Sequence, residues 1–225
     1  MNTKPPPKNR EKSIKNTDQR LAAKRVELAK TKDRLVKPQD GLNVVRPRCQ
    51  QAEKPFVDRL RFEELLVEIS TRFVNLPTEE IDTAIIDAQR RFCEFLGVDR
   101  CIIWQIIETE PIRIVLSHVQ QPPGALLPNS PMNVGDVFPW TLDQIMRGKI
   151  VNVAHPEKDL PPEADRDRKS LQRWGIKSTL VLPLLIGQKT IGAVSFGRLK
   201  VAGGWPERIL KRMHLVAQLF GNVLA

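Results

Sequence analysis

The stretch from residue 174 to residue 197, WGIKSTLVLPLLIGQKTIGAVSFG, decides the fold class. Residues 178–186 and 190–197 are rich in β-branched and other apolar side chains, which predicts two β-strands. The short sequence GQK between them is typical of a hairpin turn. We therefore expect two neighbouring antiparallel strands in this part of the chain.

A second pair of strands is expected earlier in the chain. Residues 98–107 (VDRCIIWQII) and 112–119 (IRIVLSHV) have a similar composition, and the short turn ETEP joins them. A further short strand is expected at 150–153. Two strands paired early and two paired late, with helices between them and at both ends, predict an antiparallel α+β sheet rather than a doubly wound parallel one.

Helices are expected around these strands, at 62–76, 78–96, 140–147, 161–174 and 206–225. In the first and the last of them the apolar residues are spaced four and three apart, which gives each helix an apolar seam. The seam residues are Phe62, Leu66, Ile69 and Phe73 in the first helix, and Ile209, Met213, Val216, Phe220 and Val223 in the last.

These elements predict one folded domain over residues 56–225. The terminal helices should pack on one face of its sheet, and the long loop at 120–137 with the short helices should cover the other. Residues 1–55 are expected to form a basic and largely disordered tail. Within this tail a helix is plausible at 17–37, where Leu recurs every seven residues in a partial coiled-coil pattern, and a linker follows.

The positive charge belongs mainly to that tail. The formal net charge of the chain is +10, and residues 1–50 contain 14 of its 36 Lys and Arg but only 5 of its 26 Asp and Glu. The folded part is therefore almost neutral. Because the tail has no aromatic residue on which a base could stack, its charge predicts only weak and non-specific binding to nucleic acid.

The composition favours a cytoplasmic protein without a membrane segment. The longest strongly apolar run is far shorter than the roughly 20 residues of a membrane helix, and the N-terminus lacks the apolar core of a secretory signal. The three cysteines are an odd number without regular spacing, which argues against a disulfide scaffold and suits a reducing compartment.

Three stretches resemble the GAF domain, a ligand-sensing module of bacterial signalling proteins and phosphodiesterases. They are FLGVDRCIIWQ at 95–105, the hairpin at 174–197, and WPERILKRMHLVAQLFGNVLA at 205–225. Pro183 and Gly192 match the family pattern in the two late strands. The closest resemblance is to GAF domains of sensor histidine kinases and enhancer-dependent transcription activators. It implies a sensory role, with a kinase or activator as output partner.

The sequence lacks the usual signatures of catalysis. It contains no phosphate loop, no G-x-S-x-G elbow and no H-E-x-x-H motif, and the cysteines lack metal-binding spacing. We therefore expect no enzyme, no metal and no identified cofactor. Within the GAF resemblance, neither Cys93 nor Cys101 precedes a histidine as bilin-attaching cysteines commonly do. The late cysteines of sulfoxide reductases and the NKxFDE signature of cyclic-nucleotide domains are also missing.

A small molecule could bind on the sheet face opposite the terminal helices. Aromatic walls with a few polar groups are typical of ligand pockets. The candidate residues are Trp104, His118, Phe138, Trp140, Trp174 and Ser195. The alternative is that the aromatic rings are ordinary core, that His118 and Ser195 are satisfied by solvent or backbone, and that the pocket is empty.

The terminal helices also predict a homodimer. Leu210, Ala217 and Leu224 form a second apolar row on the last helix, which suggests that one row faces the sheet and the other a partner. The resulting hypothesis is a non-enzymatic, dimeric sensory domain that binds a small molecule or relays a signal. The alternative is a ligand-free dimeric scaffold whose basic tail contacts nucleic acid or an acidic partner.

Overall fold

The computed structural model describes residues 19–31, 56–107, 113–126 and 133–225. The chain divides into two units, Met1–Leu60 and Arg61–Ala225. In the first unit residues 19–31 form an exposed helix, within the range expected for one. The predicted disorder of residues 1–16 and the predicted linker at 38–55 lie outside the described residues. No helix in the described ranges is long and apolar enough to cross a membrane.

The second unit is built on a five-stranded antiparallel sheet with the strand order β2-β1-β5-β4-β3. The strands are β1 (Arg100–Ile107), β2 (Arg113–Gln120), β3 (Val151–Val153), β4 (Ser178–Ile186) and β5 (Lys189–Arg198). The late hairpin β4–β5 pairs from Ser178 with Arg198 to Ile186 with Lys189, and β5 then pairs with β1. The predicted α+β class is therefore confirmed.

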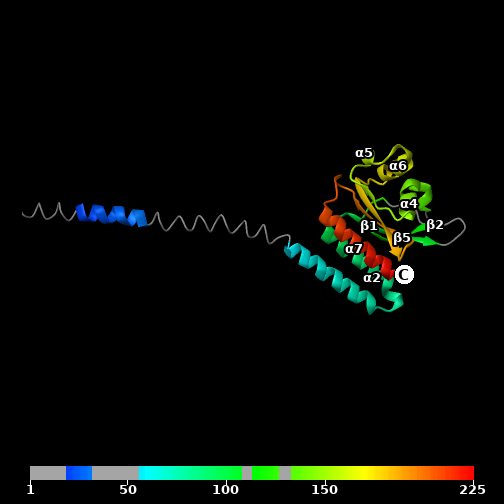
Figure 1. The fold of residues 1–225 in the computed structure, drawn as a ribbon, viewed down its shortest axis with the longest axis horizontal. Coiled ribbons are helices and arrows are strands. Elements are labelled where there is room, and N and C mark those ends of the chain that lie inside the picture. The colour runs from blue at the N-terminus through cyan, green and yellow to red at the C-terminus, as the bar shows by residue number, and fades with distance from the viewer. Residues whose placement is uncertain (1–18, 32–55, 108–112, 127–132) are drawn as a thin grey trace, which may run out of the picture. The chain divides into compact units, whose positions relative to one another are not determined.

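Two helices, α2 (Ile81–Leu96) and α7 (Glu207–Val223), cover one face of this sheet. The helix at 56–74, of which residues 61–74 belong to this unit, packs against α2, where the rings of Phe62 and Phe95 have centroids 5.4 Å apart. In Figure 1, α2 and α7 lie alongside each other, whereas α4 (Pro139–Met146) and α6 (Asp165–Arg173) lie on the other side of the strands. The expectation of terminal helices on one face and short helices on the other is confirmed.

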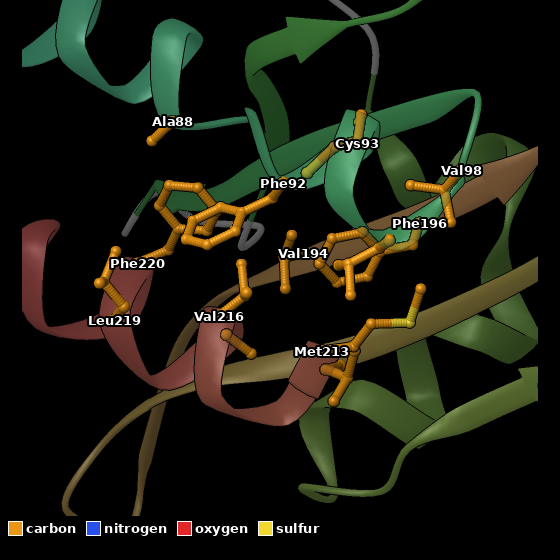
Figure 2. Packing of buried hydrophobic residues seen from close by; sticks show 14 of the residues in the cluster. Ala88, Phe92, Cys93, Val98, Val194, Phe196, Met213, Val216, Leu219 and Phe220 are labelled. Carbon is orange, nitrogen blue, oxygen red and sulfur yellow. The ribbon is translucent and has the colours of Figure 1, made fainter. Parts of the chain in front are cut away.

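The main hydrophobic core lies between the sheet and the helices α2 and α7, and the helix at 56–74 adds Phe62 and Ile69 to it. Phe92 from α2 and Phe220 from α7 are fully buried, and their rings meet edge to face with centroids 6.0 Å apart. Figure 2 shows these two rings together, with Val194 of β5 and Val216 and Met213 of α7 close by. Successive side chains of a strand point to opposite faces, so every second residue of β4 and β5 points toward the helices and contributes to this core.

This packing corrects part of the dimer prediction. Phe62, Ile69, Met213, Val216 and Phe220 are at most 3% exposed and lie in the core of the subunit itself. The seam is therefore occupied by the sheet and the neighbouring helices and is not available to a partner. Leu66, Phe73, Ile209 and Val223 are half-buried at the margin of the same core.

The second apolar row of α7 is also turned inward. Ala217 is buried, and Leu210 and Leu224 pack against the same core. Residues of both apolar rows therefore contact the core of the same subunit. This explains why the apolar face of α7 is wider than a single row. The apolar residue that α7 does expose is Leu215.

Short helices and loops cover the other face of the sheet. These are α3 (Val134–Val137), α4, α5 (Pro156–Asp159), the 3-10 turn η2 (Pro162–Ala164) and α6. The sequence predicted α4 and the region of η2 and α6 but not α3 or α5. Each of these two is a single turn closed by a local side chain: Asn133 accepts from the Gly135 N–H, and Asp159 accepts from the Ala154 and His155 N–H groups.

Candidate ligand-binding site

A cavity of about 60 Å³ lies between the sheet and the short helices. A space of this size is well above the minimum that admits a water molecule and suits a small ligand. Its floor is formed by the side chains of β1 and β5 that point away from the long helices, including Ile102, Trp104 and Ala193. The short helices provide its roof. The lining is predominantly apolar.

Two aromatic rings form one wall of the cavity. Phe138 precedes α4 and Trp174 follows α6, and their rings meet edge to face with centroids 5.2 Å apart. Both residues occupy the end of a helix, so the connections between elements place them side by side. A displacement of α4 relative to α6 would therefore change the shape of the cavity.

Three uncharged polar groups of the lining, those of Trp104, Ser195 and Thr179, already have partners within the protein. The indole N–H of Trp104 donates to Ser195 Oγ at 3.1 Å, and that hydroxyl lies 3.5 Å from the carbonyl oxygen of Ile102. The Thr179 hydroxyl donates to the Phe196 carbonyl at 3.2 Å. These groups hold the floor of the cavity together, so they offer little unused hydrogen-bonding capacity to a ligand.

Arg100 is the polar lining residue that differs from this pattern. It is 2% exposed, and its Nη2 donates to the carbonyl oxygen of Leu126 at 2.7 Å. Its Nε and Nη1 atoms are buried and have no hydrogen-bond acceptor among the described residues. Burial lowers the pKa of Arg100, because removal from water disfavours the charged form.

Sequence reasoning missed Arg100, although the sequence contains a signal for it. An arginine at the beginning of a strand is usually solvent-exposed. However, residues 100, 102 and 104 lie two apart, so Arg100 has to share a face with Ile102 and Trp104. Gly197 pairs with Arg100 in the neighbouring strand and also lines the cavity.

Four of the six predicted site residues line the cavity: Trp104, Phe138, Trp174 and Ser195. Trp140 does not line it. Its side chain is half-buried and packs against the apolar cluster around the cavity.

His118 lies on the opposite face of the sheet, which corrects its assignment to the site. Its Nε2 atom is 3.0 Å from Asp82 Oδ1 of α2, and its ring is also hydrogen-bonded to the Ser117 hydroxyl. The cause is a β-bulge: Ile103 pairs with His118 but Trp104 pairs with Leu116, so Ser117 is an extra residue. The bulge reverses the alternation of side chains along β2 and turns His118 toward the helices.

The cysteines in the described part of the chain also lie on the helix side. Cys93 and Cys101 are free and buried in the main core. Burial raises the pKa of the Cys101 thiol well above its usual range. Neither thiol lines the cavity. The described residues contain no cluster of His, Cys, Asp and Glu that could hold a metal ion.

A family model and solved structures both identify the fold as that of a GAF domain. A family model for the GAF domain matches residues 80–224. A comparison with curated proteins gives no match. The solved phycocyanobilin-bound GAF domain of a cyanobacterial phytochrome is similar, with a TM-score of 0.59 and 15% identity over 73% of this chain and 93% of that chain.

A second similar structure comes from a protein of a different class. The GAF domain of an Acinetobacter phosphoenolpyruvate-protein phosphotransferase has a TM-score of 0.54 and 15% identity, and the match covers 72% of this chain and 90% of that chain. At such identities the similarity of the structures shows the fold alone.

Proposed function

This chain belongs to the GAF domain family, and we propose from that premise that it is a sensory domain of bacterial signal transduction whose cavity binds a small molecule. GAF domains are generally regulatory and ligand-binding rather than catalytic. The observation that carries the proposal is the apolar cavity between sheet and short helices, walled by Phe138 and Trp174. Apolar walls with a few polar groups favour small-molecule binding.

The proposed ligand is much smaller than a bilin. One similar GAF domain is bilin-bound, but a linear tetrapyrrole is many times larger than a cavity of about 60 Å³. In addition, no cysteine of the described residues lines the cavity. Both observations favour a compact, non-covalently bound ligand.

The proposed mechanism is a shift between two arrangements of the helices. Neighbouring residues of β5 face opposite sides of the sheet: Ala193 and Ser195 face the cavity, while Val194 and Phe196 pack in the core under α7. A ligand that binds one arrangement of this strand better than another would bias the position of α7. A kinase or a transcription activator that responds to the position of α7 would be the output partner.

A homodimer through the terminal helices is part of the same proposal. The helix at 56–74 and α7 are separated by an apolar groove to which Leu66, Phe73 and Leu215 contribute. Val74 also lines the groove and is 83% exposed, and Val67 of the same helix is 65% exposed. The second copy is the occupant we propose, because helix pairing between two copies would cover this apolar surface and would connect two sensory domains symmetrically.

The first experiment tests whether the cavity is the ligand site. Mass spectrometry of the full chain, purified under native conditions, should detect a retained small molecule. Trp174→Ala removes one wall, so it should weaken retention by about tenfold or more. Trp140→Ala is the matched control, since its ring packs outside the cavity. Undiminished retention in the Trp174 variant would refute the assignment of the site, and the absence of any ligand would favour the scaffold alternative.

A further inference from the structure

The guanidinium of Arg100 is a buried charge without a counter-charge. Arg100 has five N–H donors, and among the described residues its Nη2 donates to the Leu126 carbonyl. Its Nε and Nη1 atoms are completely shielded from solvent. No ion pair joins it to any described carboxylate, and burial alone is the cause of its lowered pKa. A charge in this position is costly unless an anion pairs with it.

The cavity is the place from which an anion could reach this charge. Arg100 belongs to its lining, together with Thr179, Ser195 and Gly197 at the same end of β4 and β5. The hydroxyl groups of Thr179 and Ser195 are committed to backbone carbonyls or to Trp104. The Nε and Nη1 groups of Arg100 are therefore buried donors that remain available to an anion in the cavity.

The rest of the cavity restricts the kind of anion. Most of the remaining lining is aliphatic or aromatic, so it favours an apolar body over a second charge. A phosphate or sulfate has oxygens on all sides, and here several of them would lack donors. A carboxylate presents two oxygens on one side and can carry an apolar chain on the other. The volume of about 60 Å³ limits that chain to a few carbon atoms.

We propose that the cavity binds a small carboxylate with a short apolar chain, and that Arg100 pairs with its carboxylate group. This inference rests on the proposed function of the same cavity and specifies the class of ligand. Charge-assisted hydrogen bonds from the arginine would supply the affinity for the anion, and the Phe138–Trp174 wall would hold the chain.

The test is calorimetric titration of the full chain with sodium butyrate as the probe. Butyramide serves as the neutral ligand of the same shape, and inorganic phosphate as the anion without a chain. We expect butyrate to bind roughly 10- to 100-fold more tightly than butyramide, which is the range for hydrogen bonds to charged groups. Phosphate should bind more weakly than butyrate.

Variants then assign the preference to Arg100. Arg100→Met should remove the preference for butyrate over butyramide and leave butyramide binding in place. The urea concentration at the midpoint of unfolding should be no lower for this variant than for the wild type, because the substitution removes an unpaired buried charge. Arg208→Met is the matched control, since Arg208 is exposed on α7, and it should bind butyrate as the wild type does.

The possible results distinguish the choice of a carboxylate from the presence of a ligand site. Equal binding of butyrate and butyramide, or an unchanged preference in Arg100→Met, would overturn the carboxylate proposal and leave the cavity as a site for neutral ligands. Tighter binding of phosphate would overturn the choice of a carboxylate. A wild type that binds neither butyrate nor butyramide, and retains no molecule on purification, would overturn the proposed function as well. The comparison of ligands on the wild type does not depend on how any variant folds.

Discussion

Asp167 of α6 is a fully buried carboxylate that organises the roof of the cavity. Its two oxygens accept from the backbone N–H groups of Trp140 at 3.2 Å and Thr141 at 2.8 Å, in the first turn of α4. These N–H groups have no partner within the helix, and a carboxylate there also interacts favourably with the helix dipole. One side chain thus caps α4 from a distance of 26 residues and joins two helices.

Removal of this carboxylate should destabilise the domain. Asp167→Ala leaves two N–H groups without their acceptor, and we expect a loss of about 2 kcal/mol in the free energy of unfolding, measured with urea. Asp143→Ala is the control, because Asp143 forms an exposed ion pair with Arg147 in the same helix, and such pairs contribute little. Equal losses in the two variants would contradict the capping role.

The environments of Arg100 and His118 could not be predicted from the local sequence alone. The alternation of strand residues could have placed Arg100 in the cavity, but whether its charge finds a partner depends on residues distant in the sequence. For His118 the alternation itself is misleading, because the extra residue Ser117 in β2 becomes apparent only when the register with β1 is known. By contrast, the pairing of β1 with β5 is regular from Arg100 to Gln105, so Trp104 and Ser195 follow the alternation of their strands, and both line the cavity.

At the scale of elements, β5 depends on a glycine where it passes β1. Gly192 pairs with Gln105, and a Cβ atom added to it would lie 2.1 Å from the Trp104 carbonyl oxygen. No L side chain fits at that distance without a shift of the backbone. The close approach explains why this position of the strand needs a glycine even though its φ is not positive.

Gly192→Ala should therefore weaken the central strand pair. We expect a loss of about 3 kcal/mol or more in the free energy of unfolding, since the clash is with backbone and cannot be relieved by a rotamer change. Gly197→Ala is the matched variant in the same strand: its nearest neighbour would be Arg100 Cβ at 3.7 Å, an ordinary contact. A similar loss in both variants, in urea unfolding, would mean that strand propensity rather than the contact determines the effect.

The regular elements could be predicted because each has a local pattern. The late strands were expected at 178–186 and 190–197 and occur at Ser178–Ile186 and Lys189–Arg198. The helix α2 ends as expected before Gly97, which adopts a φ of 65°. The single turns α3 and α5 escaped prediction, because four residues show no helical period and their stability comes from the side chains of Asn133 and Asp159.

At the scale of the whole domain, the sheet separates a tightly packed side from a side with a cavity. The packed side contains fully buried Phe92, Phe196 and Phe220, so a change of shape there would be costly. The other side has short helices joined by side-chain to backbone contacts, such as the Ser170 hydroxyl donating to the Val137 carbonyl. A ligand can therefore adjust the roof at small cost, and the shared strands convey the adjustment to α7.

Two copies of the domain are expected to associate through the exposed surface of α7. Leu215 is the large apolar residue that α7 exposes, at 45%, and it borders the groove beside the helix at 56–74. If two copies pair across this groove, Leu215→Glu places a charge in the interface and should raise the dimer dissociation constant by about tenfold or more, measured by light scattering after size exclusion. Ile150→Glu is the matched control, because Ile150 is 48% exposed but does not border the groove. Neither change should alter unfolding by more than about 0.5 kcal/mol, since both side chains are exposed. A wild type that is monomeric at all concentrations, or equal dissociation of both variants, would exclude this surface as the dimer interface.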